Sequence, residues 1–151
     1  MAKQKRPWIV RDHSDLKQID DNLWAVEDVM ANQIHRRMCI IKRTDGSLLF
    51  FHAIPINDAT LAKVKALGRP EYYVLGHDQH TFDAHAFQQK LGLKAYGPKA
   101  KEIGLKARLE MTGSLEDIPS DSTMEIFSMP GTKHGETVIL LKSAGGARTS
   151  V

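Results

Sequence analysis

Leu75-Gly-His-Asp-Gln-His-Thr-Phe-Asp-Ala-His-Ala-Phe87 holds three of the seven histidines of the chain and two carboxylates. The stretch begins at the end of an apolar run, Glu71 to Leu75, that predicts a buried strand, and it ends in a helix pattern that Thr81 can cap. Imidazole nitrogens and carboxylate oxygens are natural ligands of zinc, and they also suit iron and manganese. The stretch is therefore the first candidate for a metal site.

Five residues are candidate metal ligands: His77, His80, Asp83, His85 and, from a later turn, His134. Those in the stretch follow a strand end and begin a helix, where side chains can converge without burying loop backbone. A second interpretation stays open, in which Asp83 only stabilises the helix N-terminus and the histidines are ordinary loop and surface residues. His52 ends a predicted strand and could face the same end of the sheet.

The composition is that of a globular protein, with 151 residues of which 42% are hydrophobic and 26% charged. We expect an N-terminal segment over residues 1–21 and one domain over residues 22–151. The lone Cys39 cannot form an internal disulfide and fits a reducing compartment. Because no apolar run approaches the roughly 20 residues of a membrane helix, we expect a cytoplasmic protein without membrane contact.

The net charge of +3 is mild and gives little support to nucleic-acid binding. The basic N-terminus, from Met1 to Arg11, is most simply a solvated tail. A second basic stretch, from Lys94 to Arg108, has no aromatic platform beside it. Nucleic acid is therefore not an expected partner.

The first half of the domain is predicted to form strands and one helix. Short apolar runs separated by polar turns indicate strands from Leu23 onward, with a hairpin around the Asp-Gly turn of residues 44–47. Asn57 can cap a helix that ends at Gly68, and the strand of residues 71–75 follows. A strand, a helix and a strand in this order imply a crossover connection and parallel pairing.

The second half is predicted to return to strands after two helices. The helix that follows the histidine stretch ends at Gly92, and a brief basic helix is expected over residues 98–106. Strands are expected at residues 124–127 and 137–141, the second apolar on both faces and therefore interior. Residues 148–151 are typical of the start of one more strand. The predicted fold class is α/β (α+β).

This order of elements, together with the histidine stretch, resembles the metallo-β-lactamase-like superfamily. The similarity is greatest to a divergent, uncharacterised DUF4336-like branch, and it is carried by Leu23-Trp-Ala-Val26, Asp45-Gly-Ser-Leu48, Ala66-Leu-Gly68 and Tyr96-Gly-Pro98. It covers about residues 22–151. The resemblance implies an αββα sandwich of two sheets flanked by helices, with a C-terminally short and incomplete second half.

The resemblance also implies a metal site. The superfamily's strand-to-helix loop reads His-x-His-x-Asp-His and binds one or two metals for hydrolysis; here His77, His80, Asp83 and His85 supply the same residue types at altered spacing. His134 lies in a turn similar to the family's Pro-Gly-His-Thr-x-Gly turn, shifted by two positions. We expect an atypical or degenerate site for zinc, iron or manganese. Asp83 is the predicted catalytic residue, which holds or deprotonates the attacking water.

Two functions from different classes follow from this resemblance. The first is a metal-dependent hydrolase acting on a small-molecule substrate. The second is a binding or interaction module that keeps the fold without catalysis, since one fold hosts many chemistries. Half a sandwich would leave an apolar sheet face uncovered, and either a homodimer or the N-terminal segment with Trp8 would cover it.

Overall fold

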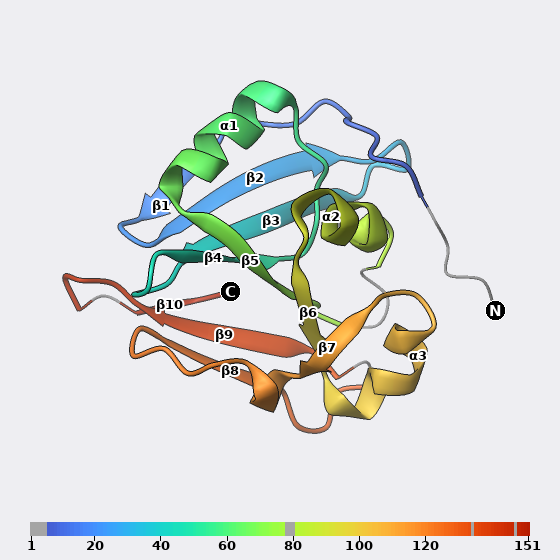
Figure 1. The fold of residues 1–151 in the computed structure, drawn as a ribbon, viewed down its shortest axis with the longest axis vertical. Coiled ribbons are helices and arrows are strands. Elements are labelled where there is room, and N and C mark those ends of the chain that lie inside the picture. Colours follow the sequence, from blue (N-terminus) through green and yellow to red (C-terminus); the bar gives the residue numbers. More distant parts are fainter. Residues whose placement is uncertain (1–5, 78–80, 134, 147) are drawn as a thin grey trace.

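Two β-sheets form the centre of the protein (Figure 1). The computed structural model describes residues 6–77, 81–133, 135–146 and 148–151. Within these residues a seven-stranded sheet contains, in order, β1 (Lys17–Asp20), β2 (Leu23–Val29), β3 (His35–Lys42), β4 (Ser47–Phe51), β5 (Arg69–Val74), β6 (Lys94–Gly97) and β7 (Met111–Ser114). A three-stranded antiparallel sheet has β9 (Thr137–Lys142) between β8 (Met124–Ser128) and β10 (Arg148–Ser150).

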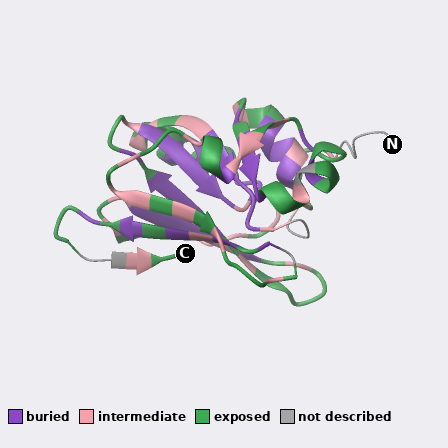
Figure 2. Ribbon diagram, turned by 90° about the horizontal axis from the view of Figure 1, so that it is seen from below, coloured by how far each residue is buried: buried purple, intermediate pink, exposed green. Residues whose placement is uncertain are grey.

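The larger sheet is covered on both faces. One core cluster joins it to α1 (Asp58–Leu67), α2 (Ala84–Leu91) and α3 (Glu102–Lys106), and a second cluster lies between the two sheets. Short 3₁₀ turns, η1 (Lys99–Lys101) and η2 (Leu115–Asp117), precede α3 and follow β7. Figure 2 shows the buried residues concentrated in the layer between the helices and the smaller sheet.

Successive residues of the central strands point alternately into the two cores. Ile40 and Phe50 belong to the helix-side core, whereas their neighbours Ile41 and Leu49 face the smaller sheet. Because side chains alternate across a strand, a strand covered on both faces must be apolar at almost every position. This explains why all the residues of β4 are buried.

The predicted hairpin and crossover are both confirmed. β3 and β4 pair antiparallel around a turn in which Gly46 has φ +80°, a conformation that glycine adopts without strain. β4 and β5 pair parallel through α1, whose N-cap Asn57 accepts a hydrogen bond of 2.8 Å from the backbone N–H of Thr60. β6 and β7 continue the parallel arrangement. The loops that follow β4, β5 and β6 therefore lie at one edge of the sheet.

The ends of the larger sheet and the N-terminal segment differ from expectation. β1 and β7 contain no buried residue, so the apolar pattern that would predict them is absent. The ring of Trp8 stacks on Phe87 with 5.5 Å between centroids, which places this segment on the helix side. Trp8 therefore does not cover the outer face of the smaller sheet, where Phe127 and Leu140 are 37% and 39% exposed.

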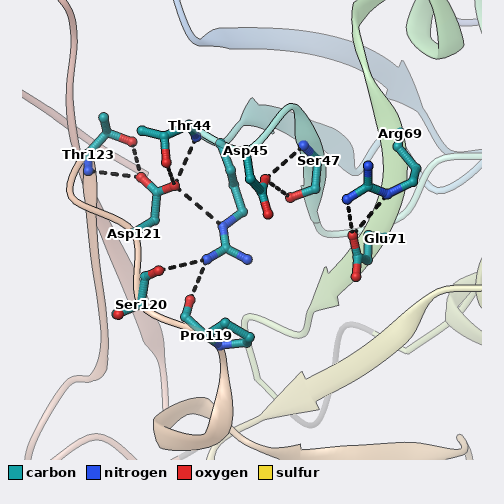
Figure 3. A network of polar contacts seen from close by, with 10 residues as sticks. Thr44, Asp45, Ser47, Arg69, Glu71, Pro119, Ser120, Asp121 and Thr123 are labelled. Carbon is teal, nitrogen blue, oxygen red and sulfur yellow. Dashed lines mark hydrogen bonds and ion pairs between the residues drawn. The ribbon is translucent and has the colours of Figure 1, made fainter.

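A polar clamp joins the β3–β4 turn to the segment before β8 (Figure 3). Asp121 accepts hydrogen bonds at Oδ2 from the backbone N–H and the hydroxyl of Thr44, at 2.9 and 2.8 Å. The buried Arg43 donates to the carbonyl oxygens of Pro119 and Ser120. Because these bonds connect the two sheets, the clamp stabilises their packing.

The clamp predicts a dependence of stability on pH. Burial opposes ionisation of Asp121, but hydrogen bonds from Thr123 and Thr44 outweigh it and lower its pKa to about 2. A lowered pKa stabilises the fold above the unfolded value of about 3.9, and this contribution is lost as pH falls through about 2. We expect Asp121→Asn to lower the free energy of unfolding by about 2 kcal/mol at neutral pH.

Urea unfolding measured from neutral pH down to about pH 2 checks this expectation, with the exposed Asp15→Asn as the matched control. The difference between the wild type and Asp121→Asn should shrink as the medium becomes more acidic. A difference that stays constant across this range would contradict a role for the ionised carboxylate.

Candidate functional site

The end of β5 meets the start of β9 at the edge where the parallel strands end. The hydroxyl of Thr137 donates to the carbonyl oxygen of Leu75 at 3.1 Å, and its backbone N–H donates to that of Gly76 at 2.7 Å. These bonds bring the turn that precedes β9 against the beginning of the histidine stretch. The two stretches predicted to supply metal ligands therefore meet in space, although about 60 residues separate them in the chain.

The structure places three of the five predicted ligands. His77 follows the end of β5 and is half-buried, and His85 is a half-buried residue in the first turn of α2. His80 and His134 lie outside the described residues. The helix also begins later than predicted: its N-cap position is Asp83, and the hydroxyl of Thr81 instead accepts a hydrogen bond from Arg108 at 2.9 Å.

Asp83 is buried and its carboxylate is engaged by two guanidinium groups. Its Oδ2 accepts hydrogen bonds from Arg36 at 2.7 Å and from Arg11 at 3.1 Å, and the residue is 3% exposed. Arg36 also donates to both carboxylate oxygens of the buried Asp28. The result is an ion-pair network that fastens the N-terminal segment and β3 to the start of α2.

The electrostatics of this network suit a structural role. Burial alone would lower the pKa of Arg36, but hydrogen bonds to Asp28 and Asp83 outweigh it and raise the pKa. Burial, together with the charge of Asp83, raises the pKa of the nearby Tyr73 phenol above its ordinary value. Arg36 and Tyr73 therefore keep their usual protonation states.

The residues present fit a metal ion only in part. Among the described residues, no group of three or more histidine, cysteine, aspartate or glutamate side chains could hold a metal ion. Asp83 does not fit a dication well, because its Oδ2 accepts hydrogen bonds from two guanidinium cations, which would repel a metal ion beside them. Among the described residues of the histidine stretch, the predicted ligands other than Asp83 are the imidazoles of His77 and His85, and imidazole suits zinc.

Sequence reasoning missed the partners of Asp83. Arg36 is 47 residues away and Arg11 is 72 residues away, so no local spacing connects them. Both arginines lie among other basic residues, in Lys3 to Arg11 and in Arg36 to Arg37. No sequence pattern distinguishes the two from these neighbours. By contrast, the expectation that His52 faces this end of the sheet agrees with its position after the last residue of β4.

Comparison with known proteins supports the fold. No family model and no curated protein matches the chain. Solved structures do match: the DIM-1 metallo-β-lactamase exposed to ceftazidime has a TM-score of 0.64 at 11% identity, over 87% of this chain and 67% of that one. The metallo-β-lactamase FIM-1 from Pseudomonas aeruginosa, in its mono-zinc form, has a TM-score of 0.57 at 14% identity, over 86% of this chain and 65% of that one.

A third match, the BLEG-1 B3 metallo-β-lactamase, has a TM-score of 0.54 at 13% identity, over 78% of this chain and 66% of that one. The chain thus spans about two thirds of the length of the structures it matches. At such low identities the similarity establishes the fold alone, and the predicted metallo-β-lactamase fold is confirmed. In the described part of the chain, no helix has the length and apolar character needed to cross a membrane.

The ion-pair network generates a prediction for Asp83. Replacing Asp83 by Asn removes the charge that compensates Arg11 and part of Arg36, so we expect the free energy of unfolding to fall by about 3 kcal/mol. Chemical denaturation measures the change, with Asp58→Asn in the first turn of α1 as an exposed control. An Asp83→Asn variant as stable as the wild type would contradict the structural role.

Proposed function

We propose that this chain is a metal-dependent hydrolase-like protein whose atypical metal site lies at the edge where β4 and β5 end. The hydrogen bonds from Thr137 to Leu75 and Gly76 carry the proposal, because they join the turn before β9 to the stretch that begins at His77. The metallo-β-lactamase fold of the chain supports it at the level of fold. The ligands would be drawn from His77, His80, His85 and His134.

Imidazoles would give this site a chemistry different from that of a site with a carboxylate. Zinc, iron or manganese, when bound, polarises a substrate carbonyl or phosphoryl oxygen and lowers the pKa of a bound water. Neutral imidazoles leave the full charge of the ion uncompensated, whereas a carboxylate ligand cancels part of it. The residues of the chain would therefore hold the ion and orient the substrate, while the imidazole ligands themselves add no negative charge.

Asp83 would position the residues of this site and would not act as its base. Its contacts with Arg11 and Arg36 fix the start of α2, and therefore the position from which His85 and the preceding loop project. Two guanidinium cations beside the carboxylate stabilise its ionised form and so weaken it as a base toward a water molecule. The contacts favour a positioning role for Asp83.

A binding or interaction module without catalysis is the second candidate. The ion pairs of Asp83 favour it, since they occupy the side chain that the superfamily resemblance assigns to hydrolysis. This candidate predicts no turnover of any substrate, with or without metal. We also propose that the chain takes a small-molecule substrate and forms a homodimer through the face of the smaller sheet on which Phe127 and Leu140 are exposed.

Metal content and turnover separate the two candidates. Protein purified without a histidine tag, loaded with zinc and dialysed, is expected to retain one zinc per chain. Replacing both His77 and His80 by Ala should abolish this retention, whereas Asp83→Asn, which leaves every imidazole in the chain, should lower it only in part. The metal content is measured by atomic emission. Turnover is measured on ester, lactam, thioester and phosphodiester substrates, with zinc, iron or manganese supplied.

Metal-free protein after loading would overturn the metal site. Retained zinc with no turnover on any of the four substrate types would favour the second candidate.

A further inference from the structure

The short helix α3 carries the most exposed large apolar side chain of the described residues. Ile103 is 90% exposed, whereas the next most exposed, Ile19, is 55% exposed. Leu105, two residues after Ile103, is fully buried. Because two residues turn an α-helix by about 200°, Ile103 points away from the core on the side opposite to Leu105. The helix lies at the periphery of the fold, beside β7 (Figure 1).

The buried side of α3 is anchored, so Ile103 is held outward at a fixed place. Leu105 and Leu109 belong to the helix-side core, and the backbone N–H of Leu109 donates to the carbonyl oxygen of Leu105 at 2.9 Å. A methyl group on Gly97, at the end of β6, would lie 2.6 Å from Cδ1 of Leu105. The helix and the strand are therefore packed closely together, and the exposure of Ile103 is a feature of an ordered helix.

Exposed lysines border this isoleucine. Residues three and four apart on a helix are neighbours on its surface. The neighbours of Ile103 are therefore Lys99, Ala100, Lys106 and Ala107, all of them exposed, and these five residues form the α3 surface. Over residues 98–110 the sequence has four cations and two carboxylates, an excess of two positive charges: Lys99, Lys101, Lys106 and Arg108 against Glu102 and Glu110.

We propose that the α3 surface binds the anionic headgroup layer of a phospholipid membrane, with Ile103 inserted between the headgroups and the lysines beside the phosphates. Peripheral binding of this kind combines buried apolar area with attraction to anionic lipids. Lysine suits it, because its aliphatic stem can lie along the apolar layer while the ammonium group stays in water. The α3 surface consists of described residues and does not depend on a metal.

A peripheral contact needs no membrane-spanning helix, and the described part of the chain has none. The contact replaces the sequence-based expectation of a protein without membrane contact. That expectation considered only whether an apolar run is long enough to span a bilayer. The exposure of Ile103 comes from tertiary packing, which its sequence neighbours do not reveal.

The composition of the α3 surface favours a membrane over other partners. Protein–protein interfaces are depleted in lysine and have a core of aromatic and other large side chains, whereas here one isoleucine lies among lysines. Single-stranded nucleic acid stacks on aromatic rings, and residues 98–110 contain none. A helix that is merely solvated would gain helix propensity from lysine or glutamate in place of isoleucine.

Sedimentation of the full chain with phospholipid vesicles tests this inference. The chain should bind vesicles of phosphatidylserine mixed with phosphatidylcholine, should not bind phosphatidylcholine alone, and should dissociate as salt screens the lysines. Ile103→Ser should lower the partition coefficient about tenfold, since it removes the inserted side chain. Ile19→Ser, at the exposed isoleucine of β1, is the matched control and should leave the partition coefficient unchanged.

Two pairs of lysines test the electrostatic part. Lys99→Gln combined with Lys106→Gln should lower the partition coefficient about thirtyfold, because each cation near an anionic surface contributes to binding. Lys63→Gln combined with Lys65→Gln removes the same charge from exposed positions of α1 and should have a much smaller effect. All the substituted side chains are exposed, so each variant should unfold at the wild-type temperature.

A wild-type chain that does not bind the anionic vesicles at low ionic strength would overturn the inference. Binding that Ile103→Ser leaves unchanged would also overturn it, because the contact would then lack its apolar part. Salt-sensitive binding to polyglutamate that Ile103→Ser weakens, without binding to vesicles, would assign the α3 surface to an acidic protein instead. None of these outcomes bears on the proposed metal site, which the metal content tests.

Discussion

The parallel pairing of β4 with β5 is the constraint on which the rest of the structure depends. Because α1 crosses from one strand to the next, both strands must end at the same edge, and so must the β6 strand that follows α2. The histidine stretch is one of the loops that leave the sheet at this edge. Thr137 then attaches the smaller sheet to the same place through Leu75 and Gly76.

The larger sheet can hold this edge firmly because both of its faces are buried. The helices cover Phe50 and Tyr73 on one side, and the smaller sheet covers Leu49 and Val74 on the other. Each face contributes apolar area removed from water, which is the main favourable term in folding. The clamp at Asp121 fastens the two sheets at the start of β4, at the opposite end of that strand from the candidate site.

Local signals in the sequence predicted much of the fold. The Asp45-Gly46 turn, the Asn57 cap and the Gly68 terminus each act within a few residues, and the elements they define are present. β1 and β7 were not predicted, because edge strands with exposed side chains carry no apolar alternation. The position of Trp8 on Phe87 depends on tertiary packing, which no pattern near Trp8 encodes.

The sequence predicted the location of the candidate site better than it predicted which side chains are available there. The strand end and helix start located it, and the Thr137 contacts bring the second histidine-bearing turn to it. The occupation of Asp83 depends on Arg11 and Arg36, which reach it from distant segments. Residue type alone could not distinguish a carboxylate available to a metal from one already paired with cations, since the difference lies in tertiary contacts.

The central claim is that this edge holds a metal through imidazoles and without Asp83. Anomalous diffraction from zinc-soaked crystals, recorded on both sides of the zinc absorption edge, tests it most directly. We expect one zinc beyond the ends of β4 and β5, coordinated by His77 and by a histidine of the turn before β9, with Asp83 still paired to Arg36. A zinc coordinated by Asp83, or crystals with no zinc at this edge, would contradict the claim.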